Sequence, residues 1–169
     1  MMTDTILTPC GEVRGTTCQW PGVRAFKGIR YATAGRFEYP MQITHWDGIY
    51  DASQYGHCSY QPRAFYNEEE KKKKIFYYNE FRKGATYTYD DDCLFLNIWV
   101  PETATPASEL PVIFYIHGGG FVLSAAGYHY KNAMFYAKQT GCKVLFVNYR
   151  LAPKHPHPVF FEDCYAAMC

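Results

Sequence analysis

The stretch PVIFYIHGGGFVLSAAG, residues 111–127, places three consecutive glycines directly after an apolar run. Glycine costs backbone entropy and offers no side chain to pack, so it is used where the backbone must take unusual conformations or be approached closely. The run PVIFYIH is almost continuously apolar, as in strands that are buried on both faces of a parallel sheet. We therefore expect a buried strand that ends in a loop made of Gly118, Gly119 and Gly120.

The segments around this loop predict an α/β fold. YHYKNAMFYAKQTG, residues 128–141, has apolar residues at helical spacing and ends in glycine, which is a common helix stop. KVLFVNY at 143–149 and CLFLNIWVP at 93–101 predict two further strands, and PVFFEDCYAAMC at 158–169 predicts a helix. The order strand, glycine loop, helix, strand, helix is typical of a βαβ unit in a largely parallel sheet.

The preceding residues have a different character. GEVRGTTCQW and VRAFKGIRYA are short β-like runs broken by glycines, which predicts N-terminal hairpin strands. Residues 44–66 predict a long, irregular surface segment. NEEEKKKKIFYY, residues 67–78, predicts a solvated helix end or loop rather than a dedicated binding tract. We find no internal repeat and expect a single domain over residues 1–169.

Composition narrows the classes of function. The chain is 48% hydrophobic and 20% charged, the balance of a soluble globular protein. Its 17 basic residues nearly cancel its 16 acidic residues, so no long-range field favours nucleic acid or anionic lipid. No window resembles a membrane span, and the opening MMTDTILTPC is a poor signal peptide. We therefore expect a cytoplasmic protein with no nucleic-acid partner and no membrane span.

The glycine loop favours the binding of an anion or of a developing oxyanion. Ligands of parallel sheets bind beyond the carboxyl ends of the strands, where glycine N–H groups can turn toward a bound atom. The spacings GxxxxGK[ST] of a phosphate loop and GxGxxG of a dinucleotide site are both absent. HGGG is instead the form found in the oxyanion loops of lipases and esterases. The alternative is a tight turn that binds nothing.

Several motifs resemble known hydrolases. IHGGGF, followed by NYRLAPKHPHPVFFEDCYAA, resembles the hormone-sensitive-lipase branch of the α/β-hydrolases. DDCLFLNIWVP and FKGIRYA resemble signatures of the type B carboxylesterases. Phe95 stands where the type B signature has tyrosine or threonine, and Lys154 stands where the YRLAPE motif has glutamate. The resemblance covers most of the chain and implies the N-terminal portion of an α/β-hydrolase fold.

The resemblance also implies a chemistry and roles for the loop residues. It implies serine-dependent hydrolysis of a small-molecule carboxylic ester, without a cofactor. Gly119 and Gly120 would donate hydrogen bonds to the oxyanion, and Gly118 would form the bend. His117 would orient the loop rather than act as the general base.

The chain has seven cysteines, an odd number, and none of them have close CxxC spacing. This pattern argues against a zinc ribbon or a small disulfide scaffold. In secreted type B enzymes, the cysteine of the DDCL motif pairs with an earlier cysteine. Cys58 resembles that partner for Cys93. If the protein is cytoplasmic, both are expected to be reduced.

Other polar residues have ordinary explanations. His155 and His157, in KHPHP, are expected to be solvated loop residues rather than metal ligands. Asp163 is expected to be structural. Residues 90–92, three aspartates, do not have the spacing of a calcium loop and are expected to form a solvated strand entry. We therefore predict no metal site.

A catalytic serine is missing from these motifs. An α/β-hydrolase needs a GxSxG elbow after the HGGG strand, then an acid and a histidine, and no serine here has that context. Ser124 is expected to be a loop or helix-capping serine. We expect the first part of a longer enzyme, with the nucleophile, acid and base beyond Cys169 and an unpaired sheet edge beside KVLFVNY. The missing C-terminal half would then be a partner. The alternative is a shortened, catalytically inactive binding module.

Overall fold

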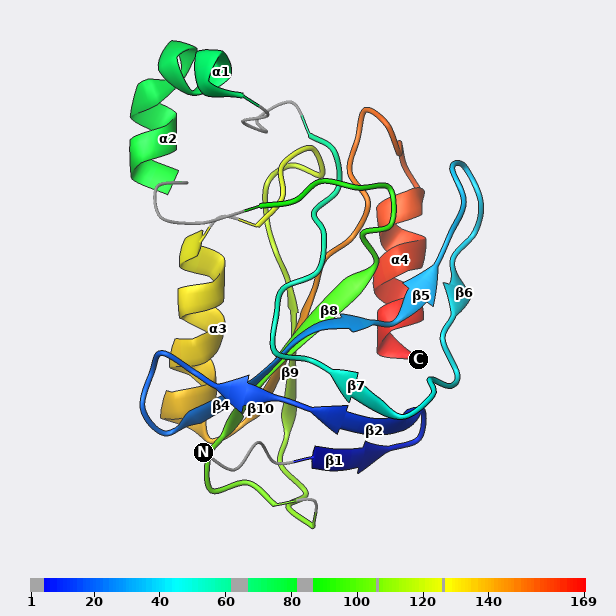
Figure 1. Ribbon diagram of the computed structural model, residues 1–169, viewed down its shortest axis with the longest axis vertical. Helices are drawn as coiled ribbons and strands as arrows, with labels where there is room; N and C mark the ends of the chain where they lie inside the picture. Colours follow the sequence, from blue (N-terminus) through cyan, green and yellow to red (C-terminus); the bar gives the residue numbers. More distant parts are fainter. Residues whose placement is uncertain (1–4, 62–66, 82–86, 106, 126) are drawn as a thin grey trace.

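The computed structural model describes residues 5–61, 67–81, 87–105, 107–125 and 127–169 (Figure 1). The strands are β1 (Thr5–Thr8), β2 (Gly11–Arg14), β3 (Thr16–Thr17), β4 (Val23–Arg30), β5 (Ala32–Thr33), β6 (Met41–Gln42), β7 (Ile49–Asp51), β8 (Phe95–Pro101), β9 (Val112–Ile116) and β10 (Lys143–Val147). The helices are α1 (Glu68–Lys73), α2 (Ile75–Phe81), α3 (Gly127–Thr140) and α4 (Val159–Met168).

The main sheet has five strands in the order β3-β4-β8-β10-β9. β9 and β10 are parallel and are joined by α3, so the predicted βαβ unit is confirmed. The β3–β4, β4–β8 and β8–β10 pairs are antiparallel, so the sheet in the described residues is mixed rather than largely parallel. Parallel pairing requires a crossover connection, and among the described residues only the β9–α3–β10 segment supplies one to this sheet.

The edge of this sheet differs from the expected one. β10 is paired on both sides, with β8 and with β9, so the prediction of an unpaired edge at 143–149 is wrong. The chain returns through α3 to the inner side of β9, which leaves β9 at the edge of the described sheet. Val112 is 59% exposed and Ile116 is 50% exposed, so the predicted burial of this strand on both faces is also wrong.

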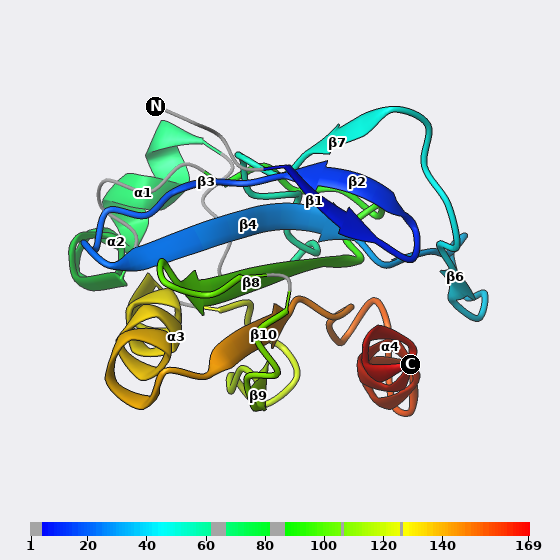
Figure 2. The ribbon, with the colours of Figure 1, turned by 90° about the horizontal axis from the view of Figure 1, so that it is seen from below.

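The two long helices lie on opposite sides of the sheet (Figure 2). Because alternate residues of a strand point to opposite faces, Phe146 packs with Trp99 and with Met134 of α3, while Val147 joins the cluster that contains Cys164 of α4. Burying a side chain as large as Phe146 contributes about 3 kcal/mol to stability. Both faces of the β8–β10 region are therefore packed.

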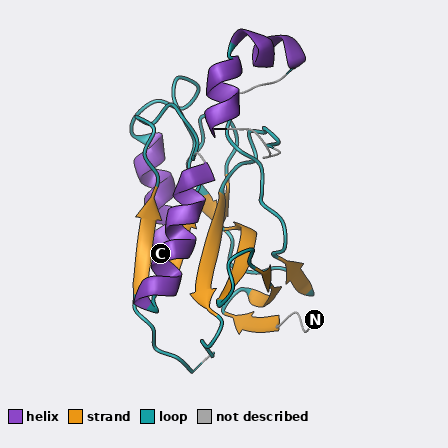
Figure 3. Cartoon of the chain, turned by 90° about the vertical axis from the view of Figure 1, so that its left-hand side faces the viewer, coloured by secondary structure: helices purple, strands orange, loops and turns teal. Residues whose placement is uncertain are grey.

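The N-terminal strands and the charged segment agree with their predictions. β1 and β2 form an antiparallel hairpin, and β7, within the segment expected to be irregular, adds to β2 in parallel. Residues 67–81 form α1 and α2, where the Asn67 side chain caps α1 by accepting from the Glu70 N–H at 2.9 Å. α1 is a solvated helix with no buried residue. Figures 1 and 3 show α1 and α2 at the end of the molecule toward which β9 points. The prediction of an irregular surface segment at 44–66 is wrong in part, because this segment contains β7 and because Cys58, Ser59 and Gln61 are buried. Its residues 62–66 lie outside the described residues.

None of the helices in the described parts of the chain is both long enough and apolar enough to span a membrane. α3 ends at Thr140, and the following Gly141 has φ +70°, a left-handed conformation that favours glycine as a helix stop. The single-domain boundary at 1–169 stays a prediction.

Candidate functional site

The glycine loop begins at the carboxyl end of β9, where His117 is 2% exposed. The imidazole of His117 stacks on the ring of Tyr149, with centroids 4.3 Å apart and planes 10° apart. Its Nδ1 lies 2.7 Å from the carbonyl oxygen of Gly118. Because a carbonyl oxygen only accepts, Nδ1 carries the hydrogen and donates it. The Tyr149 hydroxyl donates to the His117 carbonyl oxygen at 2.6 Å, which fixes the start of the loop.

Burial keeps His117 neutral. Desolvation lowers its pKa to about 4, outweighing the hydrogen bond to the Gly118 carbonyl, which favours the charged form. At neutral pH the imidazole therefore carries one hydrogen, and the Gly118 carbonyl selects the tautomer with that hydrogen on Nδ1.

The two hydrogen bonds along the loop orient two peptide groups. In a trans peptide the C=O and the following N–H point in opposite directions. His117 holds the Gly118 carbonyl, so the N–H of Gly119 points away from His117. The Gly119 carbonyl accepts from Leu123 N at 3.1 Å, so the N–H of Gly120 points away from Leu123. Neither N–H donates to any acceptor in the described part of the chain.

Glycine is required at two of these positions. Gly119 has φ +124° and Gly120 has φ +60°, conformations that residues with a Cβ rarely adopt. A Cβ at position 119 would also collide with the carbonyl oxygen of Leu123. A Cβ at position 120 or at Gly118 would meet open space, and Gly118 has no positive φ. Adjacent N–H donors without an acceptor are typical of a backbone site for an anion or a developing oxyanion.

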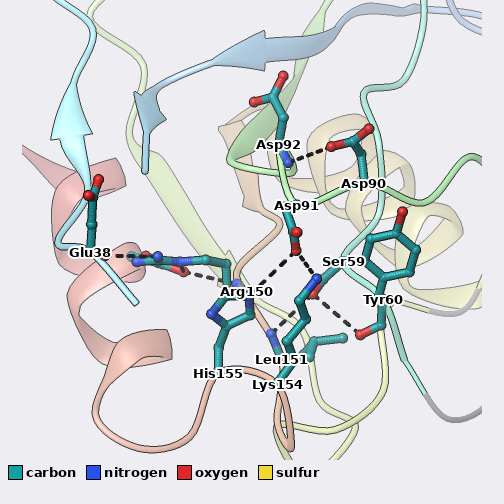
Figure 4. A network of polar contacts seen from close by, with 11 residues as sticks. Glu38, Ser59, Tyr60, Asp90, Asp91, Asp92, Arg150, Leu151, Lys154 and His155 are labelled. Carbon is teal, nitrogen blue, oxygen red and sulfur yellow. Dashed lines mark hydrogen bonds and ion pairs between the residues drawn. The ribbon is translucent and has the colours of Figure 1, made fainter. Parts of the chain in front are cut away.

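A buried ion pair joins the turn after β10 to α4, and Figure 4 shows Arg150 in that turn. Arg150 Nη2 lies 2.7 Å from Asp163 Oδ1, and the side chains are 1% and 0% exposed. The backbone N–H of Arg150 also donates to Asp163 Oδ2 at 2.9 Å, and its Nη1 donates to the Glu38 carbonyl at 3.0 Å. Asp163 is therefore structural, as expected: it anchors the turn after β10 to α4.

The acidic segment before β8 is paired rather than simply solvated. The carboxylate of Asp92 forms an ion pair with Arg30, and that of Asp91 forms one with Lys154, which lies 4.4 Å from the centroid of the Tyr60 ring. The lysine that replaces the glutamate of the YRLAPE motif therefore has a carboxylate partner in the type B segment. The side chains of Asp91 and Asp92 are 45% and 44% exposed, so they form a solvated strand entry as expected and are paired as well. Figure 4 shows the turn at 150–155 beside Asp91.

His155 is also placed differently from the expectation. It is 3% exposed, so the prediction of a solvated residue is wrong, while His157 is exposed as expected. The Nε2 atom of His155 lies 4.0 Å from Asp91 Oδ1, and the centroids of the His155 and Phe37 rings are 6.4 Å apart. Burial and the nearby Arg150 lower its pKa. The turn at 150–155 therefore places the imidazole of His155 between Asp91 and the ring of Phe37.

Cys58 and Cys93 are buried free thiols in this structure. Burial, followed by the charge of Asp163, raises the pKa of Cys93 to about 12, so its reactive thiolate does not form at neutral pH. Within the described ranges, no group of three or more His, Cys, Asp or Glu side chains is arranged to hold a metal ion. Ser124 is buried in the loop before α3, and its backbone N–H donates to Gln61 Oε1 at 3.0 Å.

The fold defines an α/β-hydrolase. A solved structure titled thermophilic PNB esterase matches 99% of this chain and 34% of its own length, with a TM-score of 0.74 and 30% identity. The model of the carboxylesterase family matches residues 2–153, and the chain belongs to this family.

Individual relatives are much longer than this chain. The para-nitrobenzyl esterase of Bacillus subtilis is 33% identical over 152 residues, and the acetylcholinesterase of Electrophorus electricus is 31% identical over 155 residues. Each match covers 88% of this chain, but only 28% and 23% of the respective relative. A tuliposide A-converting enzyme of Tulipa gesneriana is 48% identical over 64 residues. The chain thus spans about a quarter of the length of the first two relatives.

Sequence reasoning did not assign roles to three residues that support the loop. Tyr149 lies within the NYRLAP motif, but the motif does not predict that its side chain contacts His117. Gln61 and Ser59 lie in an irregular segment, where no periodic pattern marks them. Gln61 contacts Ser124, which is 63 positions away in the sequence, and Ser59 contacts Leu151, which is 92 positions away.

Proposed function

We propose that this chain supplies the oxyanion loop of a serine-dependent carboxylic ester hydrolase, with the N–H groups of Gly119 and Gly120 as the donors. The observation that carries the proposal is the orientation of these two N–H groups, which no acceptor in the described residues satisfies. Membership of the carboxylesterase family supports the same class of reaction. The substrate would be a small-molecule carboxylic ester.

The proposed chemistry places these donors at the atom that gains charge. When a serine oxygen attacks the ester carbonyl, the carbon becomes tetrahedral and the negative charge moves onto the former carbonyl oxygen. Donors aimed at that oxygen bind it more strongly than they bind the ground-state carbonyl, which accelerates the reaction. One preorganised donor of this kind contributes about 3 kcal/mol of transition-state stabilisation.

The remaining catalytic groups are proposed to come from polypeptide outside this sequence. The chain's serines, Ser53, Ser59, Ser108 and Ser124, all lack the GxSxG context. A C-terminal half would supply the nucleophile, the general base and its acid. The isolated 169-residue chain is therefore expected to hydrolyse p-nitrophenyl esters no faster than the buffer does. A cytoplasmic location likewise stays a prediction.

A fusion protein tests the proposal. Residues 2–153, which match the family model, would replace the corresponding segment of the Bacillus subtilis para-nitrobenzyl esterase, and turnover of a p-nitrophenyl ester would be measured per folded molecule. We expect turnover well above the buffer rate, because the loop supplies the donors that the recipient enzyme has lost. A fusion that folds cooperatively and shows no turnover would contradict the proposal and favour a binding module.

A further inference from the structure

We propose that Gln61 is a positioning residue for the oxyanion loop, an inference that rests on the function proposed for that loop. Gln61 lies before α1 in sequence and is 4% exposed. Its Oε1 accepts the backbone N–H of Ser124 at 3.0 Å, a buried contact between segments 63 residues apart. Ser124 lies in the same loop as Gly119 and Gly120, so Gln61 contacts this loop through the backbone of Ser124.

Gln61 belongs to a set of hydrogen bonds that joins three irregular segments to one another: residues 59–61, the glycine loop and the turn after β10. Ser59 Oγ accepts the N–H of Leu151 at 3.3 Å (Figure 4). The N–H of Ala152 donates to the Phe121 carbonyl at 2.8 Å. The segment 59–61 therefore holds both the glycine loop and the turn after β10, and those two also hold each other. These bonds satisfy buried backbone groups that no strand or helix satisfies.

The contact is transmitted to the proposed donors through the backbone. Ser124 directly follows Leu123, whose N–H donates to the Gly119 carbonyl at 3.1 Å. That carbonyl belongs to the same peptide group as the N–H of Gly120, so fixing Ser124 fixes the direction of the Gly120 donor. His117 and Tyr149 orient the Gly119 donor from the other end of the loop. Gln61 thus positions a donor without touching the substrate.

The hydrogen bond to Ser124 explains why glutamine suits position 61. The Ser124 N–H can only donate, so it requires the amide oxygen. Gln61 Nε2 lies 3.5 Å from the Ser59 carbonyl oxygen, which favours the same orientation of the amide. Methionine has a similar length but offers no comparable acceptor. Glutamate keeps an oxygen at the required place, although burial disfavours its charge.

Amide hydrogen exchange in the 169-residue chain tests the contact itself. In Gln61→Met, exchange at the N–H of Ser124 is expected to accelerate about tenfold or more relative to the wild type, because its acceptor is removed. Asn97→Leu is the matched control, since Asn97 Oδ1 is a buried amide oxygen that accepts the Gly28 N–H at 2.9 Å in the sheet. That control is expected to leave the exchange at Ser124 unchanged. Equal exchange at Ser124 in Gln61→Met and the wild type would overturn the proposal.

Kinetics of the fusion protein test the consequence. Gln61→Met is expected to lower kcat about tenfold to a hundredfold with KM changed less than about twofold, because a displaced donor weakens only the transition state. Gln61→Glu is expected to retain more of kcat than Gln61→Met. Asn97→Leu is expected to lower the melting temperature and leave kcat per folded molecule unchanged. A wild-type kcat in folded Gln61→Met would overturn the proposal, whereas an inactive unmutated fusion would count against the proposed function and leave the exchange result to decide on Gln61.

Discussion

At the scale of single residues, neighbouring glycines of the loop have different requirements. The backbone at Gly119 is left-handed and has no room for a Cβ, whereas Gly118 has an ordinary φ and open space beside it. An alanine at position 119 therefore perturbs the fold of the loop as well as any chemistry at its donors. Gly118→Ala is therefore the control variant, because it adds a methyl group to the loop without a steric clash.

The first prediction concerns the stability of these two variants. Gly119→Ala is expected to lower the free energy of unfolding by about 2 kcal/mol or more, since both strain and a steric clash oppose it. Gly118→Ala is expected to change it by less than about 1 kcal/mol, because its backbone conformation suits alanine. Urea denaturation of the 169-residue chain measures both. Equal stabilities of the two variants would show that the loop does not hold the described backbone conformation.

The second prediction concerns the pH dependence of stability that His117 introduces. Its folded-state pKa of about 4 lies below the ordinary histidine value of 6.5, so the unfolded chain binds the proton first as the pH falls. The associated stability is present above pH 6.5 and is lost between pH 6.5 and about 4. The full loss is about 3 kcal/mol.

His117→Asn isolates this effect. Asparagine keeps a donor for the Gly118 carbonyl and does not titrate. Burial also lowers the pKa values of His129 and His155, so the test is the difference between the wild type and the variant at each pH. The wild type is expected to lose more stability than the variant between pH 6.5 and 4. Parallel stability curves for the two proteins would contradict the buried, neutral His117.

At the scale of elements, local sequence patterns predicted what local forces determine. The apolar periodicity of residues 128–141 and the final glycine predicted α3 and its end, and the apolar runs predicted β8, β9 and β10. Pairing order has no such local signal, so the edge position of β9 was not foreseen. The burial of His155 and the contact of Gln61 with Ser124 were missed for the same reason: each depends on a segment far away in the sequence.

The third prediction concerns the ion pair between the turn after β10 and the segment before β8. Lys154→Glu restores the glutamate of the YRLAPE motif but places it against Asp91. We expect a loss of about 1 kcal/mol in stability, a modest value because both side chains are partly exposed. The charge swap Lys154→Glu with Asp91→Lys is expected to recover most of this loss. A thermal melt in which Lys154→Glu matches the wild type would contradict the pairing.

At the scale of the whole molecule, the main sheet leaves apolar surface open at its β9 edge and on the face that carries α4. β9 has an unpaired side within the described sheet, with Val112 and Ile116 half exposed. On the face that carries α4, a hollow of about 690 Å³ lies between that helix and the β1–β2 hairpin, with Ile6, Phe26 and Ile98 in its lining. An exposed apolar edge strand is a template for pairing with another chain.

The fourth prediction follows from this edge. The 169-residue chain is expected to self-associate, and Val112→Lys is expected to reduce its association because a charge on an edge strand opposes pairing. Phe161→Lys is the control, since Phe161 is at least as exposed as Val112 but lies on helix α4 rather than on a sheet edge. Sedimentation velocity over a range of concentrations gives the measurement. A wild-type chain that stays monomeric at all concentrations would contradict the open edge.

The central claim is that the N–H groups of Gly119 and Gly120 stabilise an oxyanion. The most direct test replaces the peptide N–H of Gly120 with an ester oxygen in the fusion protein, which removes the donor and adds no side chain. We predict a fall in kcat of about a hundredfold with little change in KM, the effect of losing one oxyanion donor. The melting temperature of the same protein reports how much the weakened Gly119 carbonyl disturbs the loop. A folded ester variant with wild-type kcat would contradict the claim.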